Sequence, residues 1–110
     1  MMIDELKMDN LLLDLGHDDF NRGTAYIREA VRLYKPGMRL TKELYPVIAK
    51  RHGSTAARVE RCMRHSLEKA WNRADLARQH AVFRASVDPN RARPTVGEYV
   101  ARLWRELHED

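Results

Sequence analysis

The chain has 110 residues, of which 44% are hydrophobic and 33% charged, so one small core and a single domain over residues 1–110 are expected. No apolar run approaches the length of a membrane span, and the acidic first residues exclude a signal peptide. The only cysteine, Cys62, excludes a disulfide within the chain, which favours a cytoplasmic protein.

The positive charge lies away from the N-terminus. Residues 1–20 hold six acidic residues and one basic residue, and the whole chain carries +4, so residues 21–110 carry +9. The basic residues are densest between Lys50 and Arg64. This distribution favours an acidic partner for the middle of the chain.

No segment alternates as a strand does, so the sequence predicts an all-α fold of about six helices. The first is expected over Asp4–Leu15, where Gly16 ends it, and the second from an Asp18 cap to about Tyr34. Gly23 is a weak point in the second helix. The residues expected to face the core are Ile3, Leu6, Leu12 and Leu15, followed by Phe20, Ile27, Ala30, Val31 and Tyr34.

A break at Lys35-Pro36-Gly37 precedes a short amphipathic helix that ends at His52. Pro46 lacks the amide that a position inside a helix needs. The helix therefore either starts near Tyr45 with Pro46 in its first turn, or is capped by Thr41 and kinked at the proline. The residues expected to face inward are Leu44, Val47, Ile48 and Ala49.

The next segment, Thr55–Trp71, predicts a helix with two opposed faces that continues to about Arg73. Gly53 suits the preceding turn, and Ser54 or Thr55 suits the cap. One face is apolar or small, with Val59, Met63, Ser66, Leu67, Ala70 and Ala74, and the other is polar, with Arg58, Arg61, Arg64, His65, Glu68 and Asn72. A short helix, a tight turn and a longer basic helix predict a helix-turn-helix over about 41–73.

Two interpretations of the basic face remain open from the residues alone. Arginines on successive turns fit a helix that binds guanines in the major groove of DNA. A solvated face is the alternative, with Glu60 and Glu68 pairing with Arg64 and Arg61. Trp71 is expected to pack at the rim of the core.

The last part of the chain predicts two further helices. Asp75 can cap a short helix to about Phe83, and a loop over Arg84–Pro94 follows. Thr95 and Glu98 have the spacing of a capping box. The final helix has Val96, Tyr99, Val100, Leu103, Trp104 and Leu107 on one face. This face is expected to cover the core, with Tyr99 and Trp104 as candidates for a protein interface.

The sequence contains no pattern typical of an enzyme or a metal site. The five histidines are scattered, and Cys62 and His65 have no further ligand at a spacing that would complete a zinc site. Glycine-rich phosphate loops and the common hydrolase motifs are absent. We expect no catalytic activity, no bound metal and no cofactor.

Four segments resemble the C-terminal effector domain of stage-zero sporulation protein A, a response regulator of endospore-forming bacteria. They are YIREAV (Tyr26–Val31), LTKELYPVIAKRH (Leu40–His52), TAARVERCMRHSLEKAWNR (Thr55–Arg73) and RPTVGEYVA (Arg93–Ala101). The resemblance covers nearly the whole chain after Leu11. It implies an all-helical domain that binds double-stranded DNA at a TGTCGAA-like box.

The resemblance also implies roles for individual residues. Base contacts are expected from Glu60, Arg61 and Arg64, where an acid suits the amino group of cytosine. The matched positions of Arg58 and His65 imply contacts nearer the DNA backbone. Beyond the resemblance, backbone contacts are also expected from Lys50, Arg51, Ser54, Thr55, Arg91 and Arg93. The family usually has a glycine where this chain has Ala74, which predicts a less sharp break after the helix.

Besides DNA, the sequence suggests protein partners. A homodimer on tandem boxes and RNA polymerase are candidate partners. Family members carry an N-terminal receiver domain that this chain lacks, so the chain is either an excised effector domain or a stand-alone relative. The rival functions are a small α-helical protein-interaction module and a nonspecific, nucleoid-type DNA binder.

Overall fold

The computed structural model describes residues 4–17, 21–83 and 93–108, and these residues form helices without any strand. This confirms the all-α fold. The elements are α1 (Glu5–Asp14), α2 (Arg22–Leu33), the π-helical turn η1 (Leu40–Leu44), α3 (Tyr45–Arg51), α4 (Ala56–Arg73), α5 (Leu76–Phe83) and α6 (Val96–His108). No helix in the described ranges is long and apolar enough to cross a membrane.

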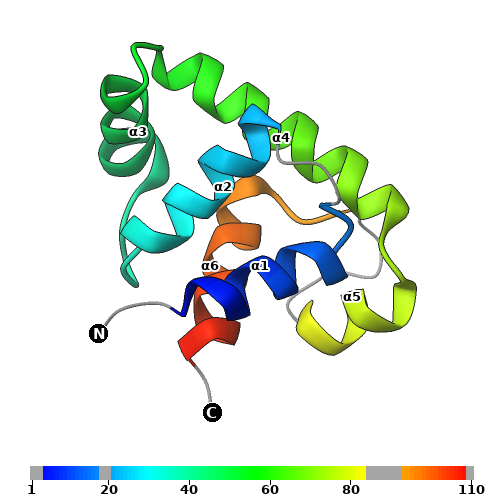
Figure 1. Cartoon of the computed structure of the whole chain (residues 1–110). Helices are drawn as coiled ribbons and strands as arrows, with labels where there is room; N and C mark the ends of the chain where they lie inside the picture. The colour runs from blue at the N-terminus through cyan, green and yellow to red at the C-terminus, as the bar shows by residue number, and fades with distance from the viewer. Residues whose placement is uncertain (1–3, 18–20, 84–92, 109–110) are drawn as a thin grey trace.

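Helix α2 lies at the centre of the molecule and packs against α3, α4 and α6 (Figure 1). Its residues Ile27, Ala30 and Val31 are fully buried because they recur at helical spacing on the face that meets these neighbours. Helix α4 runs along the edge of the fold and buries one side only (Figure 1). The opposite side of α4 is left at the surface.

Helix α1 has the predicted extent but a different buried face. Asp4 caps it, because its carboxylate accepts hydrogen bonds from the Leu6 and Lys7 amides, and Gly16 turns the chain with φ +96°. Leu6 was expected inside and is 70% exposed. It precedes the buried Met8 by two residues, or about 200° around the helix, so it lies on the opposite side. The buried residues are Met8, Leu11, Leu12 and Leu15; Ile3 lies outside the described residues.

Helix α2 starts later than predicted. Its cap is Asn21, whose side chain accepts from the Thr24 amide at 2.8 Å, and not Asp18, which lies with Phe20 outside the described residues. Gly23 faces α4 where the two helices cross. A Cβ at this position would collide with the carbonyl oxygen of Cys62 and lie 2.6 Å from the Ser66 Cβ. The glycine is therefore required for packing, and its low helix propensity is offset by the close approach.

Of the two placements considered for Pro46, the structure has the proline in the first turn of a helix and not at a kink. Helix α3 begins at Tyr45 with Pro46 in its first turn, where no amide is needed. The preceding turn is π-helical and starts after Arg39 without a side-chain cap, so Thr41 does not cap it; the Glu43 carboxylate accepts from the Arg39 amide at 3.0 Å. Val47 was expected inside but is 42% exposed; Tyr45 is buried instead, at i, i+3 and i+4 with Ile48 and Ala49.

The predicted signals after α4 are confirmed. Helix α4 ends at Arg73, and Ala74 takes an extended conformation with ψ 147°, so no glycine is needed at this break. The side chain of Asp75 accepts from the Ala77 amide at 2.9 Å at the start of α5. Thr95 and Glu98 form the reciprocal capping box of α6, with hydrogen bonds of 2.9 and 3.1 Å.

A buried polar cluster joins four parts of the fold. His17, after α1, lies with Nε2 2.8 Å from the Tyr99 hydroxyl of α6 and Nδ1 3.2 Å from the Thr24 hydroxyl of α2. The Thr24 and Ser66 hydroxyls are 2.9 Å apart, which brings in α4. Because buried polar groups are costly when unpaired, this cluster favours a single relative placement of the helices.

Candidate nucleic-acid interface

Helices α3 and α4 meet at a tight turn that orients α4. The turn passes through Gly53 with φ +60°, and the Ser54 amide donates to the Ala49 carbonyl at 2.9 Å. Thr55 then caps α4, because its hydroxyl accepts from the Arg58 amide at 3.2 Å. Of the two predicted caps, Thr55 is the one used. The result is the helix-turn-helix that the sequence predicted.

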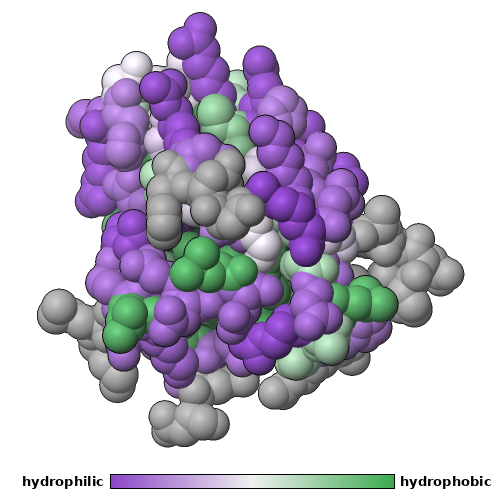
Figure 2. Space-filling view, turned by 45° about the vertical axis from the view of Figure 1, so that its right-hand side comes forward, coloured by the Kyte–Doolittle hydropathy of each residue, from purple (hydrophilic) through white to green (hydrophobic). Residues whose placement is uncertain are grey.

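The two faces of α4 are divided as predicted, except that Ala74, expected on the inner face, lies beyond the helix at its C-cap and is half-buried. The inner face buries Val59, Met63, Ser66, Leu67 and Ala70, whereas Arg58, Arg61, Arg64 and His65 are exposed. In Figure 2 most side chains in the upper part of the view are hydrophilic, and the hydrophobic groups visible in this view are separated from one another. Trp71 is half-buried and makes edge contacts with Phe83 and Tyr99, so it belongs to the rim of the core.

One flank of the exposed face carries a network of ion pairs. The Arg64 guanidinium lies 3.0 Å from a Glu60 carboxylate oxygen and 3.9 Å from Glu68, and Arg93 lies 3.1 Å from Glu68. Glu60 also lies near α3, where burial, and then the Glu60 charge, raise the pKa of Tyr45 to about 12. The first expected pair, Glu60 with Arg64, is therefore present, whereas Glu68 pairs with Arg64 and Arg93 instead of Arg61.

The other flank carries arginines without such pairs. Neither Arg58 nor Arg61 has a carboxylate partner within the described ranges 4–17, 21–83 and 93–108. Both line a hollow of about 420 Å³ that also includes Ser54 and Arg22, the first residue of α2. Sequence reasoning missed Arg22, since only its basic side chain at a helix start marked it.

Helix α4 thus forms a ridge between two hollows. The second hollow, of about 470 Å³, lies on the flank of Glu60 and Arg64 and is lined on its other side by the segment from Arg93 to Val96 at the start of α6. Both hollows are therefore bordered by the first turn of a helix that is remote in sequence from α4. An exposed helix with unpaired arginines on one flank, and arginines paired with glutamates on the other, presents positive charge and hydrogen-bonding groups that suit a DNA groove.

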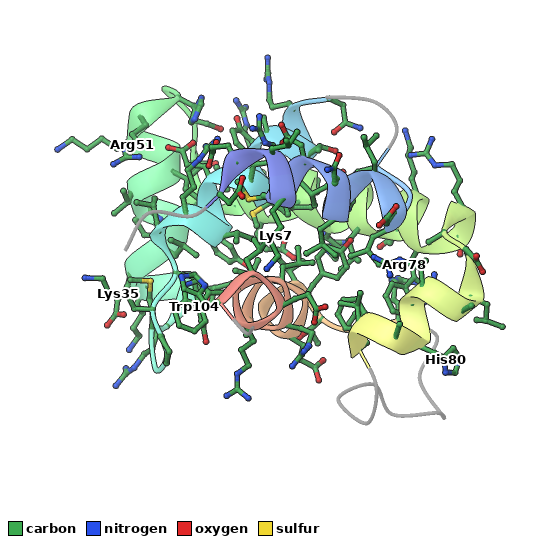
Figure 3. The ribbon with its side chains drawn as sticks, turned by 60° about the horizontal axis from the view of Figure 1, so that its bottom comes forward. Lys7, Lys35, Arg51, Arg78, His80 and Trp104 are labelled. Carbon is green, nitrogen blue, oxygen red and sulfur yellow. The ribbon has the colours of Figure 1, made fainter. Side chains whose placement is uncertain are left out.

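The remaining candidate contacts lie around this ridge. Lys50 is exposed at the end of α3, and Arg51 projects from the same helix (Figure 3). The Arg51 guanidinium lies 2.9 Å from the Glu29 carboxylate of α2, and the His52 imidazole lies 2.6 Å from it. Arg51 is therefore not a free cation in this structure. Arg91 lies outside the described residues.

Glu29 gives this region a pH dependence. Burial raises its pKa, but hydrogen bonds from His52 and Arg51 outweigh burial, so the pKa is lowered from its usual value of 4.5. The carboxylate therefore stabilises the fold above about pH 4.5, and this contribution is lost as the pH falls through the lower pKa of the folded state.

Glu29→Gln is expected to lower the free energy of unfolding by about 1 kcal/mol at neutral pH, because one hydrogen-bonding partner, Arg51, is largely exposed. The difference from the wild type should shrink as the pH falls below 4.5, which urea unfolding at several pH values will measure. A loss of equal size at all pH values would contradict the assignment of the effect to the ionised carboxylate.

Tyr99 corrects the interface prediction on α6. Its side chain is 0% exposed, stacks on Phe83 with ring centroids 5.4 Å apart and is hydrogen-bonded to His17, so no partner protein can reach it. Trp104 is half-buried and points toward the loop after α2 that carries Lys35 (Figure 3). It packs against Tyr34 and His108 at centroid distances of 5.9 and 4.0 Å. Of the two interface candidates, only Trp104 is accessible to a partner.

Within the described residues, no group of three or more His, Cys, Asp or Glu side chains could hold a metal ion. Cys62 is half-buried beside the crossing of α2 and α4 and packs against the core.

Comparison with known families agrees with this geometry. Residues 8–107 match the family model described as sporulation initiation factor Spo0A C terminal. The match includes α2 to α5, all but the last residue of α6 and most of α1, so it covers α4 and the segments that line both hollows. This is a family of DNA-binding transcription regulator domains and not a family of enzymes. The chain belongs to the sporulation initiation factor Spo0A C-terminal family, the DNA-binding effector domains of sporulation response regulators.

Proposed function

We propose that this protein is a sequence-specific transcription regulator whose helix α4 enters the major groove over a TGTCGAA-like box. The observation that carries the proposal is an acid among arginines on an exposed ridge: Glu60 lies beside Arg64 and one residue before Arg61. An acid weakens binding to phosphates. An acid can add to the affinity for DNA only where a base edge offers a hydrogen-bond donor, as the amino group of cytosine does.

The proposed base contacts are Glu60, Arg61 and Arg64. Arginine can bond the O6 and N7 atoms of guanine bidentately, and a carboxylate accepts from cytosine N4. The Glu60–Arg64 pair holds both side chains near the groove side of the ridge before DNA arrives, which lowers the entropy lost on binding. The two side chains together suit neighbouring cytosine and guanine.

The proposed backbone contacts surround this centre. Ser54, Thr55 and Arg58 lie at the start of α4, where amides and a partial positive charge favour phosphate. His65 lies about two turns beyond Arg58, and Arg93 lies beside α4 just before α6. Lys50, Arg51 and Arg91 complete the set. Arg51 must exchange Glu29 for phosphate, so we expect a smaller contribution from it than from Arg58.

Alanine substitution should separate base reading from backbone positioning. Arg61→Ala or Arg64→Ala is expected to cost about 1–3 kcal/mol on the box and to relax preference at one base pair. Glu60→Ala should leave affinity for scrambled DNA unchanged or raise it, while discrimination at a cytosine is lost. Arg58→Ala is the contrast variant: it should weaken binding to all sequences about equally and flatten the salt dependence by about one unit.

Binding measured in a salt series on box and scrambled duplexes tests this proposal and its rivals together. A sequence reader separates the two duplexes by several kcal/mol. A nonspecific binder treats them alike, and a protein-interaction module binds neither. If Glu60→Ala preserves the ratio of specific to nonspecific binding and Arg61→Ala lowers both affinities in parallel, α4 binds DNA by charge alone and does not read its sequence.

We further propose that the protein is monomeric off DNA and pairs on tandem boxes. One reading helix makes few contacts, so two linked boxes should bind more tightly than one through a protein contact between neighbours. Trp104 is the candidate for that contact or for one with RNA polymerase, because it remains accessible on α6. Sedimentation that shows a stable dimer without DNA would contradict this, as would equal affinity for one box and two.

A further inference from the structure

We infer that the hollow between the first turn of α2 and helix α4 is a binding site for a backbone phosphate of DNA, and that Arg22 is a phosphate-binding residue there. This inference rests on the proposed function. It adds to the reading helix a contact from α2, which lies outside the helix-turn-helix formed by α3 and α4.

Three arginines line the hollow without carboxylate partners among the described residues. They are Arg22 from α2 and Arg58 and Arg61 from α4, and all three are exposed. Most other described arginines are paired with an acid: Arg28, Arg32, Arg51, Arg64, Arg78, Arg93 and Arg102. Three unpaired guanidinium groups around one depression repel one another, so an anion that enters it is favoured.

Arg22 is held beside α4 by buried contacts. The next residue, Gly23, touches the backbone of α4 at Cys62, and the Thr24 hydroxyl lies 2.9 Å from that of Ser66. Asn21 caps the helix by accepting from the Thr24 amide. The backbone of Arg22 is therefore fixed next to the ridge, and only its side chain has to be ordered when it binds an anion.

The hollow also offers neutral hydrogen-bond donors. Ser54, whose hydroxyl can donate, lines it at the turn before α4, and the first turn of the 12-residue helix α2 adds the partial positive charge of a helix N-terminus. A phosphodiester carries a single charge and accepts several hydrogen bonds, which suits this set.

The position of the hollow indicates which phosphate it would bind. It lies on one flank of α4, and Arg93 lies on the other. The two strands of a duplex border the major groove on opposite sides. Arg22 and Arg58 would therefore bind one strand, whereas Arg93 could bind the other only by exchanging Glu68 for phosphate.

The test compares Arg22→Gln with Arg105→Gln, which removes the same charge from an exposed position near the end of α6. Arg22→Gln should flatten the slope of log K against log salt by about 0.9 on both box and scrambled duplexes, a loss of up to about eightfold near 0.1 M salt. Arg105→Gln should leave the slope unchanged, and Arg22→Lys should retain most of it. Circular dichroism and thermal unfolding of each variant establish that it is folded.

A neutral methylphosphonate placed at single positions around the box locates the contact. It should weaken wild-type binding at one position on the α2 side and have no further effect there on Arg22→Gln. If the wild type separates box from scrambled DNA while Arg22→Gln behaves as Arg105→Gln does, the inference is overturned and the proposed function stands. If the wild type does not separate the two duplexes, the proposed function fails, and the slope change alone decides whether Arg22 binds phosphate.

Discussion

Gly23→Ala is expected to lower the free energy of unfolding by about 3 kcal/mol, the upper end of the usual cost of overpacking. The added methyl group would collide with the Cys62 carbonyl oxygen and lie 2.6 Å from the Ser66 Cβ, so α2 and α4 must separate. Neither obstacle is the end of a flexible side chain that could rotate away. Separation would also strain the Thr24–Ser66 hydrogen bond at the same crossing. Urea unfolding of the purified variant measures the loss.

Gly97→Ala is the matched control. Position 97 lies in the first turn of α6, and a Cβ there would have no atom closer than 3.9 Å. Since alanine is a better helix former than glycine, this variant should be neutral or more stable by up to about 1 kcal/mol. Similar free energies of unfolding for the two variants would show that the helix crossing is not as close as described.

Tyr99→Ala is expected to destabilise the fold by about 4 kcal/mol, as removal of a large buried aromatic side chain does. Tyr99 is fully buried, stacks on Phe83 and contacts the edge of Trp71. Its hydroxyl lies 2.8 Å from His17, and burial raises its pKa, so the group stays protonated. Thermal and urea unfolding will measure the effect.

Tyr99→Phe separates the hydroxyl from the ring. It keeps the ring packing and leaves the buried His17 Nε2 without the Tyr99 partner, which should cost about 1–3 kcal/mol. Trp104→Ala should cost less than Tyr99→Ala, since Trp104 is half-buried. If Tyr99→Ala unfolds with the same free energy as the wild type, the tyrosine is not part of the core and is available for a protein interface.

Local signals in the sequence determined the elements and most of their boundaries. A cap or a turn depends on a few neighbouring residues, so Asp75 and the pair Thr95 and Glu98 could be identified from the sequence, and Thr55 was one of two candidates. Helical periodicity likewise predicted which side of α4 is exposed, because that side repeats over the five turns of an 18-residue helix. The all-α fold and the exposure of Arg61 and Arg64 follow from these signals.

Only the tertiary structure decided which residues meet across helices. In short helices a few apolar residues fit more than one face, so Leu6 and Val47 were placed inside and lie outside. The role of Gly23 depends on a backbone 39 residues further along the chain, and that of Tyr99 on His17, 82 residues before it. Arg22 likewise lines one hollow with Arg58 and Arg61 only because α2 packs against α4. Propensity and periodicity describe one segment at a time, whereas a helix crossing or a shared hollow depends on the packing of two segments that no local pattern relates.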